Sequence, residues 1–131
     1  MKFRPSYLLF LLCFFCFTCS DNKLKVKNNS SKEIIVYYFR TDEITEYGGG
    51  TRILPNFTKS IPAINRTKWE EVFEESPDKK VRFYIYDADL MVGKTATEHL
   101  DWIRDTKNCL SKQKLSVSEL ESLNWEISYS D

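Results

Sequence analysis

Gly93, Lys94 and Thr95 are the residues whose types and spacing come nearest to a known chemical motif. They close the stretch 88–95, which follows a strand pattern and precedes a helix pattern, as the phosphate-binding loop of nucleotide enzymes does. The match requires Ala88 in place of the first glycine, and bulky apolar residues then stand where backbone amides must wrap a phosphate. A nucleotide enzyme also needs a second acidic strand end for magnesium, and none is visible. The sequence therefore predicts no nucleotide binding and no cofactor.

A second set of polar residues lies around the same strand end. Asp87 and Asp89 precede Glu98, His99 and Asp101, and carboxylate oxygens are the ligands that calcium and similar cations take. The spacing lacks a full calcium-loop pattern, and His99 is the only histidine, so a catalytic zinc site or a histidine-based triad has too few parts. We keep Asp87 and Asp89 as candidate metal ligands beside the alternative of a solvated strand end.

Aromatic residues make up 15% of the chain, which suggests a sugar-binding surface because sugars stack on exposed rings. Tyr84, Tyr86 and Trp125 are the candidate ligand-binding residues. The alternative is that these rings fill the core of a small sheet. Solvent exposure of the three rings distinguishes the two interpretations.

The first twenty residues have the pattern of an export signal. Lys2 and Arg4 precede an uncharged apolar run over 7–17, which ends abruptly at polar residues. The run is shorter than the roughly 20 residues that a membrane-spanning helix needs. We therefore expect the segment 1–18 to be removed and the remainder to be exported.

Cys19 stands where this signal ends. The sequence Phe17-Thr18-Cys19-Ser20 resembles the cleavage box of bacterial lipoproteins, in which the cysteine becomes the first residue and carries a diacylglyceryl thioether and an N-acyl chain such as palmitate. A multiply acylated terminus would hold the protein on a membrane, because each buried methylene contributes about 0.8 kcal/mol. The alternative is an ordinary signal peptide, cleaved near Thr18 or Ser20, that leaves no lipid.

The mature chain has the size of one domain. Removal of residues 1–18 from 131 leaves 113. Of the 19 basic residues, Lys2 and Arg4 leave with the signal, so 17 remain against 19 acidic ones, a balance that does not favour nucleic-acid binding. Cys109 is the other cysteine of the mature chain, and we interpret it as a small buried residue.

Periodicity predicts a mainly antiparallel sheet. Residues 24–27 and 33–40 are expected to form a hairpin around the polar turn 28–31. Prolines push the short extended segments 51–54 and 59–64 to a sheet edge. The stretch 81–87 is the clearest strand, and a closing strand is expected after Asn124, which can end a helix in the left-handed conformation.

Three short helices are predicted from capping boxes, in which a Ser or Thr is followed three residues later by Glu. The pairs are Thr67 with Glu70, Thr95 with Glu98, and Ser116 with Glu119.

The signal ending at Cys19, the strand and turn over 26–30, the aromatic strand ending at Asp87, and the stretch 115–129 resemble small uncharacterised lipoproteins of Bacteroidota. Those proteins often end in a Leu-Ser/Thr-x-x-Asp/Glu-Leu-x-x-Leu-Asn-Trp-x-Ile-x-Tyr pattern, which matches residues 115–129. The resemblance implies lipidation at Cys19 and residence at the outer membrane, on its periplasmic face or on the cell surface. It brings no established activity.

The sequence thus predicts an α+β fold: a small, mainly antiparallel sheet covered by two or three short helices. We expect the signal peptide to cover 1–18, a tether 19–23, and one domain 24–131. The leading functional hypothesis is a non-enzymatic, lipid-anchored envelope protein that binds another envelope component or has a structural role. The alternatives are glycan or ligand binding through exposed aromatics, and a hydrolase or metal-dependent enzyme using Asp87, Asp89 and His99.

Overall fold

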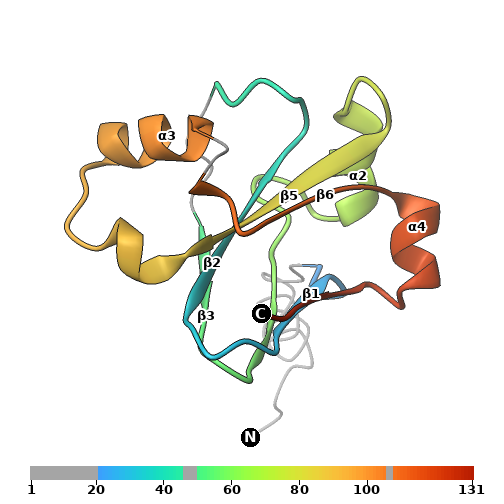
Figure 1. The fold of residues 1–131 in the computed structure, drawn as a ribbon. Helices are drawn as coiled ribbons and strands as arrows, with labels where there is room; N and C mark the ends of the chain where they lie inside the picture. Colours follow the sequence, from blue (N-terminus) through green and yellow to red (C-terminus); the bar gives the residue numbers. More distant parts are fainter. Residues whose placement is uncertain (1–20, 46–49, 106–107) are drawn as a thin grey trace, which may run out of the picture.

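The fold is α+β, with seven strands and four short helices among the described residues (Figure 1). The computed structural model describes residues 21–45, 50–105 and 108–131. The strands are β1 Lys25–Asn28, β2 Ile34–Phe39, β3 Thr51–Ile53, β4 Thr58–Ser60, β5 Lys80–Asp87, β6 Ser111–Ser116 and β7 Glu126–Tyr129. The helices are α2 Trp69–Glu75, the 3-10 helix η2 Ala88–Met91, α3 Ala96–Arg104 and α4 Val117–Ser122.

The strands form two sheets rather than one. The larger has the order β3-β2-β5-β6 and is antiparallel throughout, and the smaller has the order β4-β1-β7. In the smaller sheet β1 pairs antiparallel with β4 and parallel with β7. The predicted hairpin of 24–27 with 33–40 is therefore wrong, because β1 and β2 belong to different sheets. The prediction that 51–54 and 59–64 lie at sheet edges is confirmed by β3 and β4.

Asn28 explains why the chain leaves one sheet for the other at this point. Its side chain is fully buried, and its amide donates to the carbonyls of Lys32 (2.7 Å) and Ile53 (3.1 Å). Its carbonyl accepts from the amide (3.0 Å) and the hydroxyl (2.7 Å) of Ser30. A buried polar group is stable only when its hydrogen bonds are made, and this corner makes them. The predicted polar turn is thus a junction between the sheets, with Asn28 and Ser30 buried and Asn29 and Ser31 exposed.

The larger sheet is buried on both faces because β5 alternates two apolar sets. Val81, Phe83 and Ile85 face the smaller sheet, α2 and α4, where the main core lies. Tyr84 and Tyr86 face the opposite side, which η2 and α3 cover. The helices therefore lie on both sides of this sheet.

Two of the three capping boxes are confirmed. Thr95 and Glu98 cap α3, and Ser116 and Glu119 cap α4, each with both reciprocal hydrogen bonds. The box predicted for Thr67 and Glu70 is wrong, because α2 begins at Trp69 and Thr67 contacts Glu71 instead, with 3.1 Å between its amide and the carboxylate.

Candidate functional site

The first described residues are attached directly to the domain. Asp21 accepts a hydrogen bond of 2.9 Å from the amide of Trp69, the first residue of α2. It thereby satisfies a helix N-terminus that has no side-chain cap of its own. The Lys23 ammonium pairs with Glu70 and lies 4.1 Å from the centre of the Trp125 ring. The segment expected to be a tether over 19–23 is thus fixed to the domain from Asp21 onward.

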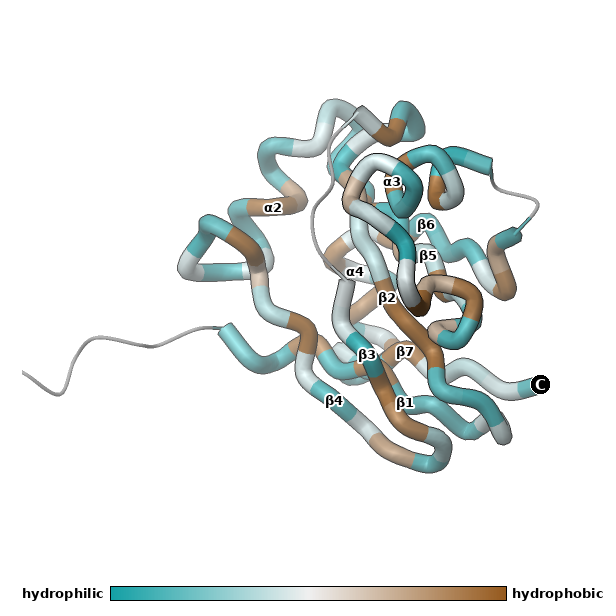
Figure 2. Tube along the Cα trace, turned by 90° about the vertical axis from the view of Figure 1, so that its left-hand side faces the viewer, coloured by the Kyte–Doolittle hydropathy of each residue, from teal (hydrophilic) through white to brown (hydrophobic). Residues whose placement is uncertain are grey.

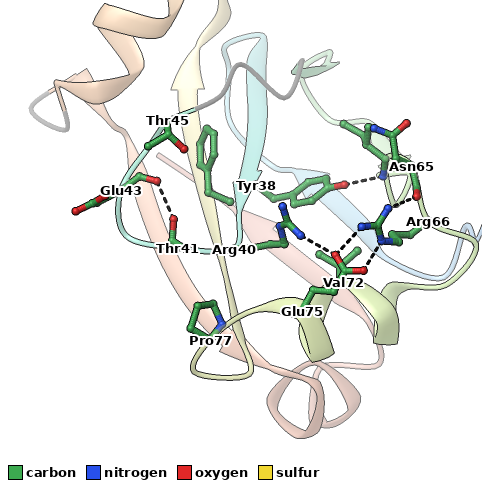
Figure 3. Close-up of a pocket in the computed structure, with 12 residues that line it drawn as sticks. Tyr38, Arg40, Thr41, Glu43, Thr45, Asn65, Arg66, Val72, Glu75 and Pro77 are labelled. Carbon is green, nitrogen blue, oxygen red and sulfur yellow. Dashed lines mark hydrogen bonds and ion pairs between the residues drawn. The ribbon is translucent and has the colours of Figure 1, made fainter.

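A cleft of about 500 Å³ opens between the end of β2 and α2. Its walls come from three stretches: the end of β2 with the following loop, the residues before α2, and α2 itself with Pro77 (Figure 3). The Tyr38 hydroxyl lies against one wall, where it accepts a 2.6 Å hydrogen bond from the amide of Ile64. The Tyr38 ring meets Trp69 edge-on, with 4.8 Å between the centroids, so this wall is held by the core. A hollow of this size can receive a small ligand or a side chain of a partner.

Glu75 organises the charges of the cleft. Its carboxylate accepts from Arg40 at 2.6 Å and from both Nε and Nη2 of Arg66, at 2.6 and 2.7 Å (Figure 3). The hydrogen bonds from Arg66 lower the pKa of Glu75, and the same contact raises the pKa of Arg66. Because Glu43 also lines the cleft, two basic residues stand against two acidic ones. The cleft therefore offers hydrogen-bonding groups without a net charge.

Arg82 forms a second charge cluster on the larger sheet. Its side chain is 4% exposed, and it donates to Asp42 (3.0 Å), to Asp78 (2.6 Å) and to the carbonyl of Arg40 (2.9 Å). Lys114 adds an ion pair to Asp78 at 2.8 Å. These contacts raise the pKa of Arg82 and hold the pKa values of Asp42 and Asp78 below their usual range. The guanidinium of Arg82 is thus fully engaged by carboxylates and carbonyls of the protein.

The stretch 88–95 does not form a phosphate loop. Residues 88–91 are the helix η2, and the Thr95 hydroxyl accepts from the amide of Glu98 at 3.3 Å. The Glu98 carboxylate in turn accepts from the amide of Thr95 at 2.7 Å. The first turn of α3 is therefore capped by its own side chains rather than open to an anion.

Asp87 and Asp89 do not gather into a metal site. Asp87 accepts from the amide of Asp89 at 3.0 Å, which caps η2, and lies 3.5 Å from the Lys32 ammonium. His99 instead directs its Nε2 to the carbonyl of Met91 at 3.0 Å. Within the described ranges, no three His, Cys, Asp or Glu side chains lie close enough together to hold a metal ion. The candidate ligands thus act as a helix cap and an exposed residue.

The candidate aromatic platform is wrong, because Tyr84 and Tyr86 are core residues with 1% and 0% exposure. Their rings are stacked with 6.4 Å between centroids, but the Tyr86 hydroxyl donates to the carbonyl of Ile103 beneath α3. Burial raises the pKa of Tyr86. Trp125 is half-buried, with Phe73 against its edge and the Lys23 ammonium over its face. Tyr84 and Tyr86 therefore have no exposed face for a sugar, and the three rings do not form one exposed platform.

Of the two cysteines expected in the mature chain, Cys19 lies outside the described residues. Cys109 is half-buried beside β5, and its thiol donates to the carbonyl of Ser111 at 2.8 Å. Burial raises the pKa of this thiol, and Cys109 packs against the core as a half-buried residue rather than the fully buried one that we expected.

The cleft residues Tyr38, Arg40, Arg66 and Glu75 were not singled out from the sequence. Only the position of Arg40 directly after an aromatic strand hinted at a charged strand end. No helix among the described residues is long and apolar enough to cross a membrane. No family model, curated protein or solved structure matches the chain.

Proposed function

We propose that this protein is a lipid-anchored protein of the bacterial cell envelope that acts by binding, without catalysing a reaction. The observation that carries the proposal is the junction at Cys19. An apolar leader ends there, and the folded domain is attached two residues later, at Asp21. A lipid on Cys19 would therefore hold the domain directly on the membrane surface.

The contacts of the described residues support a binding role. Of the polar candidates for catalysis, Asp87 caps η2 and His99 contacts the carbonyl of Met91, while the acidic and basic side chains around Arg82 pair with one another. What remains open is the cleft at the end of β2, whose walls combine Tyr38 with hydrogen-bonding side chains. We assign to this cleft the contact with another envelope component.

The experiment that tests the anchor is mass spectrometry of the N-terminal peptide after extraction from membranes. The native protein is expected to begin at Cys19 and to carry the mass of a diacylglyceryl group and an acyl chain. Cys19→Ser removes that mass and releases the protein from the membrane fraction. Cys109→Ser is the matched control, because it removes the other thiol of the mature chain and keeps the lipid. A native chain that begins at another residue, or that carries no acyl mass, contradicts the proposal.

A second candidate function is the binding of a polar, uncharged ligand such as a glycan in the cleft. The balanced charges around Glu75 favour it, because such a ligand needs hydrogen bonds and an aromatic wall rather than a charge partner. Titration with soluble oligosaccharides, followed by NMR, is expected to shift the amides of Ile64 and Asn65 at the cleft. Unchanged amides there exclude the glycans that were tested.

A further inference from the structure

The turn between β3 and β4 presents two large apolar side chains to solvent. The amide of Phe57 donates to the carbonyl of Leu54 at 3.2 Å, and Asn56 between them has φ of 62°. Proline at the second position and a positive φ at the third are features of a type II turn, and proline also limits its flexibility. Leu54 is 54% exposed and Phe57 60%. The turn therefore holds both apolar side chains outside the core in a defined conformation.

Basic residues surround this turn. Lys27 pairs with Thr58, the residue after Phe57, and Lys59 donates to the carbonyl of Arg52 at 3.2 Å. Arg52 lies 3.7 Å from Glu33, whereas Lys27 and Lys59 make no ion pair within the described ranges. A surface with exposed apolar side chains and neighbouring lysines can bind a bilayer interface. Its aromatic and aliphatic side chains enter the acyl region, and its ammonium groups contact the lipid phosphates.

The turn and the start of the described chain lie along one margin of the molecule, joined by β4. At one end of this margin the amide of Ile61 donates to the carbonyl of Leu24 at 2.9 Å, and at the other the amide of Asn28 donates to the carbonyl of Phe57 at 2.9 Å. The four steps along the chain from Phe57 to Ile61 span about 13 Å. Figure 2 shows β4 at the outside of the molecule, between the first described residues and the turn.

Cys19 must lie close to the first described residue. Only Ser20 separates it from Asp21, and the two steps along the chain correspond to at most about 7 Å of extended backbone. A flat bilayer that holds a lipid on Cys19 can therefore also reach the turn. We propose that Leu54 and Phe57 insert into the same leaflet as the lipid on Cys19, with Lys27 and Lys59 at its phosphates, so that the domain lies on its β4 edge. This inference rests on the lipid anchor proposed above.

The test places an environment-sensitive NBD label at the turn of the lipidated protein. Phe57→Cys is labelled in a Cys109→Ser background, because the sulfur of an acylated Cys19 is a thioether and does not react. The protein is reconstituted into phosphatidylethanolamine and phosphatidylglycerol vesicles that contain doxyl-labelled lipid. Val92→Cys, at a residue that is 69% exposed after η2, is the matched control, and Leu54→Cys is a second test position.

The label at residue 57 or 54 is expected to emit at shorter wavelength and to be quenched by the doxyl lipid, whereas the label at residue 92 keeps its emission in water. Equal, water-like emission at all three positions, with the acyl mass present on Cys19, overturns this inference alone. An emission that shifts to shorter wavelength but is not quenched by the doxyl lipid indicates that another protein surface, not the bilayer, covers the turn. That result also overturns the inference. A mature chain without acyl mass overturns both this inference and the proposed anchor.

Discussion

Asn28 provides a sharp test of how the two sheets are joined. Asn28→Asp keeps the shape of the side chain, and its oxygen can still accept from Ser30. The introduced carboxylate cannot donate to the carbonyls of Lys32 and Ile53, which Asn28 contacts at 2.7 and 3.1 Å. The substitution therefore removes two hydrogen bonds and leaves a negative charge beside two carbonyl oxygens, without creating a cavity.

The size of the effect follows from the environment of each carbonyl. A buried acceptor that loses its donor costs about 1–3 kcal/mol, and the carbonyl of Ile53 is the buried one of the two. The carbonyl of Lys32 is only partly buried and can turn to water, so the cost of losing its donor is at the lower end of this range. We expect a decrease of about 3 kcal/mol in the free energy of unfolding at pH 7. At about 4 °C for each kcal/mol in a domain of this size, the melting temperature falls by roughly 12 °C.

The effect also depends on pH in a defined direction. The carbonyl oxygens and burial raise the folded pKa of the introduced carboxyl above the unfolded value of about 3.9. Destabilisation is therefore complete above the folded pKa and decreases as the pH falls toward 3.9, because the protonated carboxyl is neutral and can donate one hydrogen bond.

The assay is urea unfolding followed by tryptophan fluorescence, between pH 7 and pH 3. Asn29→Asp is the matched control, because it makes the same change of charge at the adjacent, exposed residue. We expect that control to remain within about 0.5 kcal/mol of the parent protein. Comparing the two variants at each pH removes the acid sensitivity of the remaining chain. Equal stability of the two variants at pH 7, or a difference that does not change with pH, would refute this account of the corner.

Three further predictions concern the core, the charge cluster around Arg82 and the half-buried thiol of Cys109. Leu120 is a fully buried residue of α4, and Leu120→Ala is expected to lower the free energy of unfolding by about 3 kcal/mol in the same urea assay. The control is Leu123→Ala, at a residue that is 44% exposed, which is expected to change it by less than about 1 kcal/mol. Since Arg82 lowers the folded pKa of Asp78, Asp78→Asn is expected to destabilise the protein above pH 4, by an amount that shrinks in thermal melts toward pH 2 as acid protonates the native carboxylate. Asp89→Asn, at an exposed residue without an ion pair among the described residues, is the control and is expected to change the free energy of unfolding at pH 7 by less than about 0.5 kcal/mol. Cys109, whose thiol pKa is raised by burial, is expected to react with iodoacetamide at pH 8 more slowly than a free cysteine, and to reach the rate of free cysteine in urea.

The sequence predicts contacts within one helix or strand better than contacts between segments that are distant in the chain. The boxes of Thr95 with Glu98 and of Ser116 with Glu119 form as expected, because both partners lie within one helical turn. The cap of α2 differs, because Lys23, far away in sequence, pairs with Glu70, and Glu71 then contacts Thr67. Alternation in β5 predicts two faces correctly, but it does not indicate that both are covered.

The cleft could not be predicted from the sequence for the same reason. Arg40, Arg66 and Glu75 meet in the cleft from three separate parts of the chain, and no spacing in the sequence connects them. The motifs that the sequence does display, at Asp87 and at Gly93 to Thr95, are local, and the structure uses them locally to start helices. A short polar motif before a helix therefore indicates a cap unless a second segment brings ligand-binding groups to it.

The pairing of β1 links the fold to the proposed export. β1 lies between β4 and β7, so the strand that follows Asp21 is completed only when residues 126–129 are available to pair with residues 25–28. Contacts between such distant segments form late, because the intervening loop must be closed first. β1 can pair with β4 as soon as residues 58–60 are present, but its other edge stays unpaired until residues 126–129 have been made. An export machinery that engages the leader would therefore meet an incompletely folded chain, and the domain would complete its smaller sheet only after the segment next to Cys19 is free to pair.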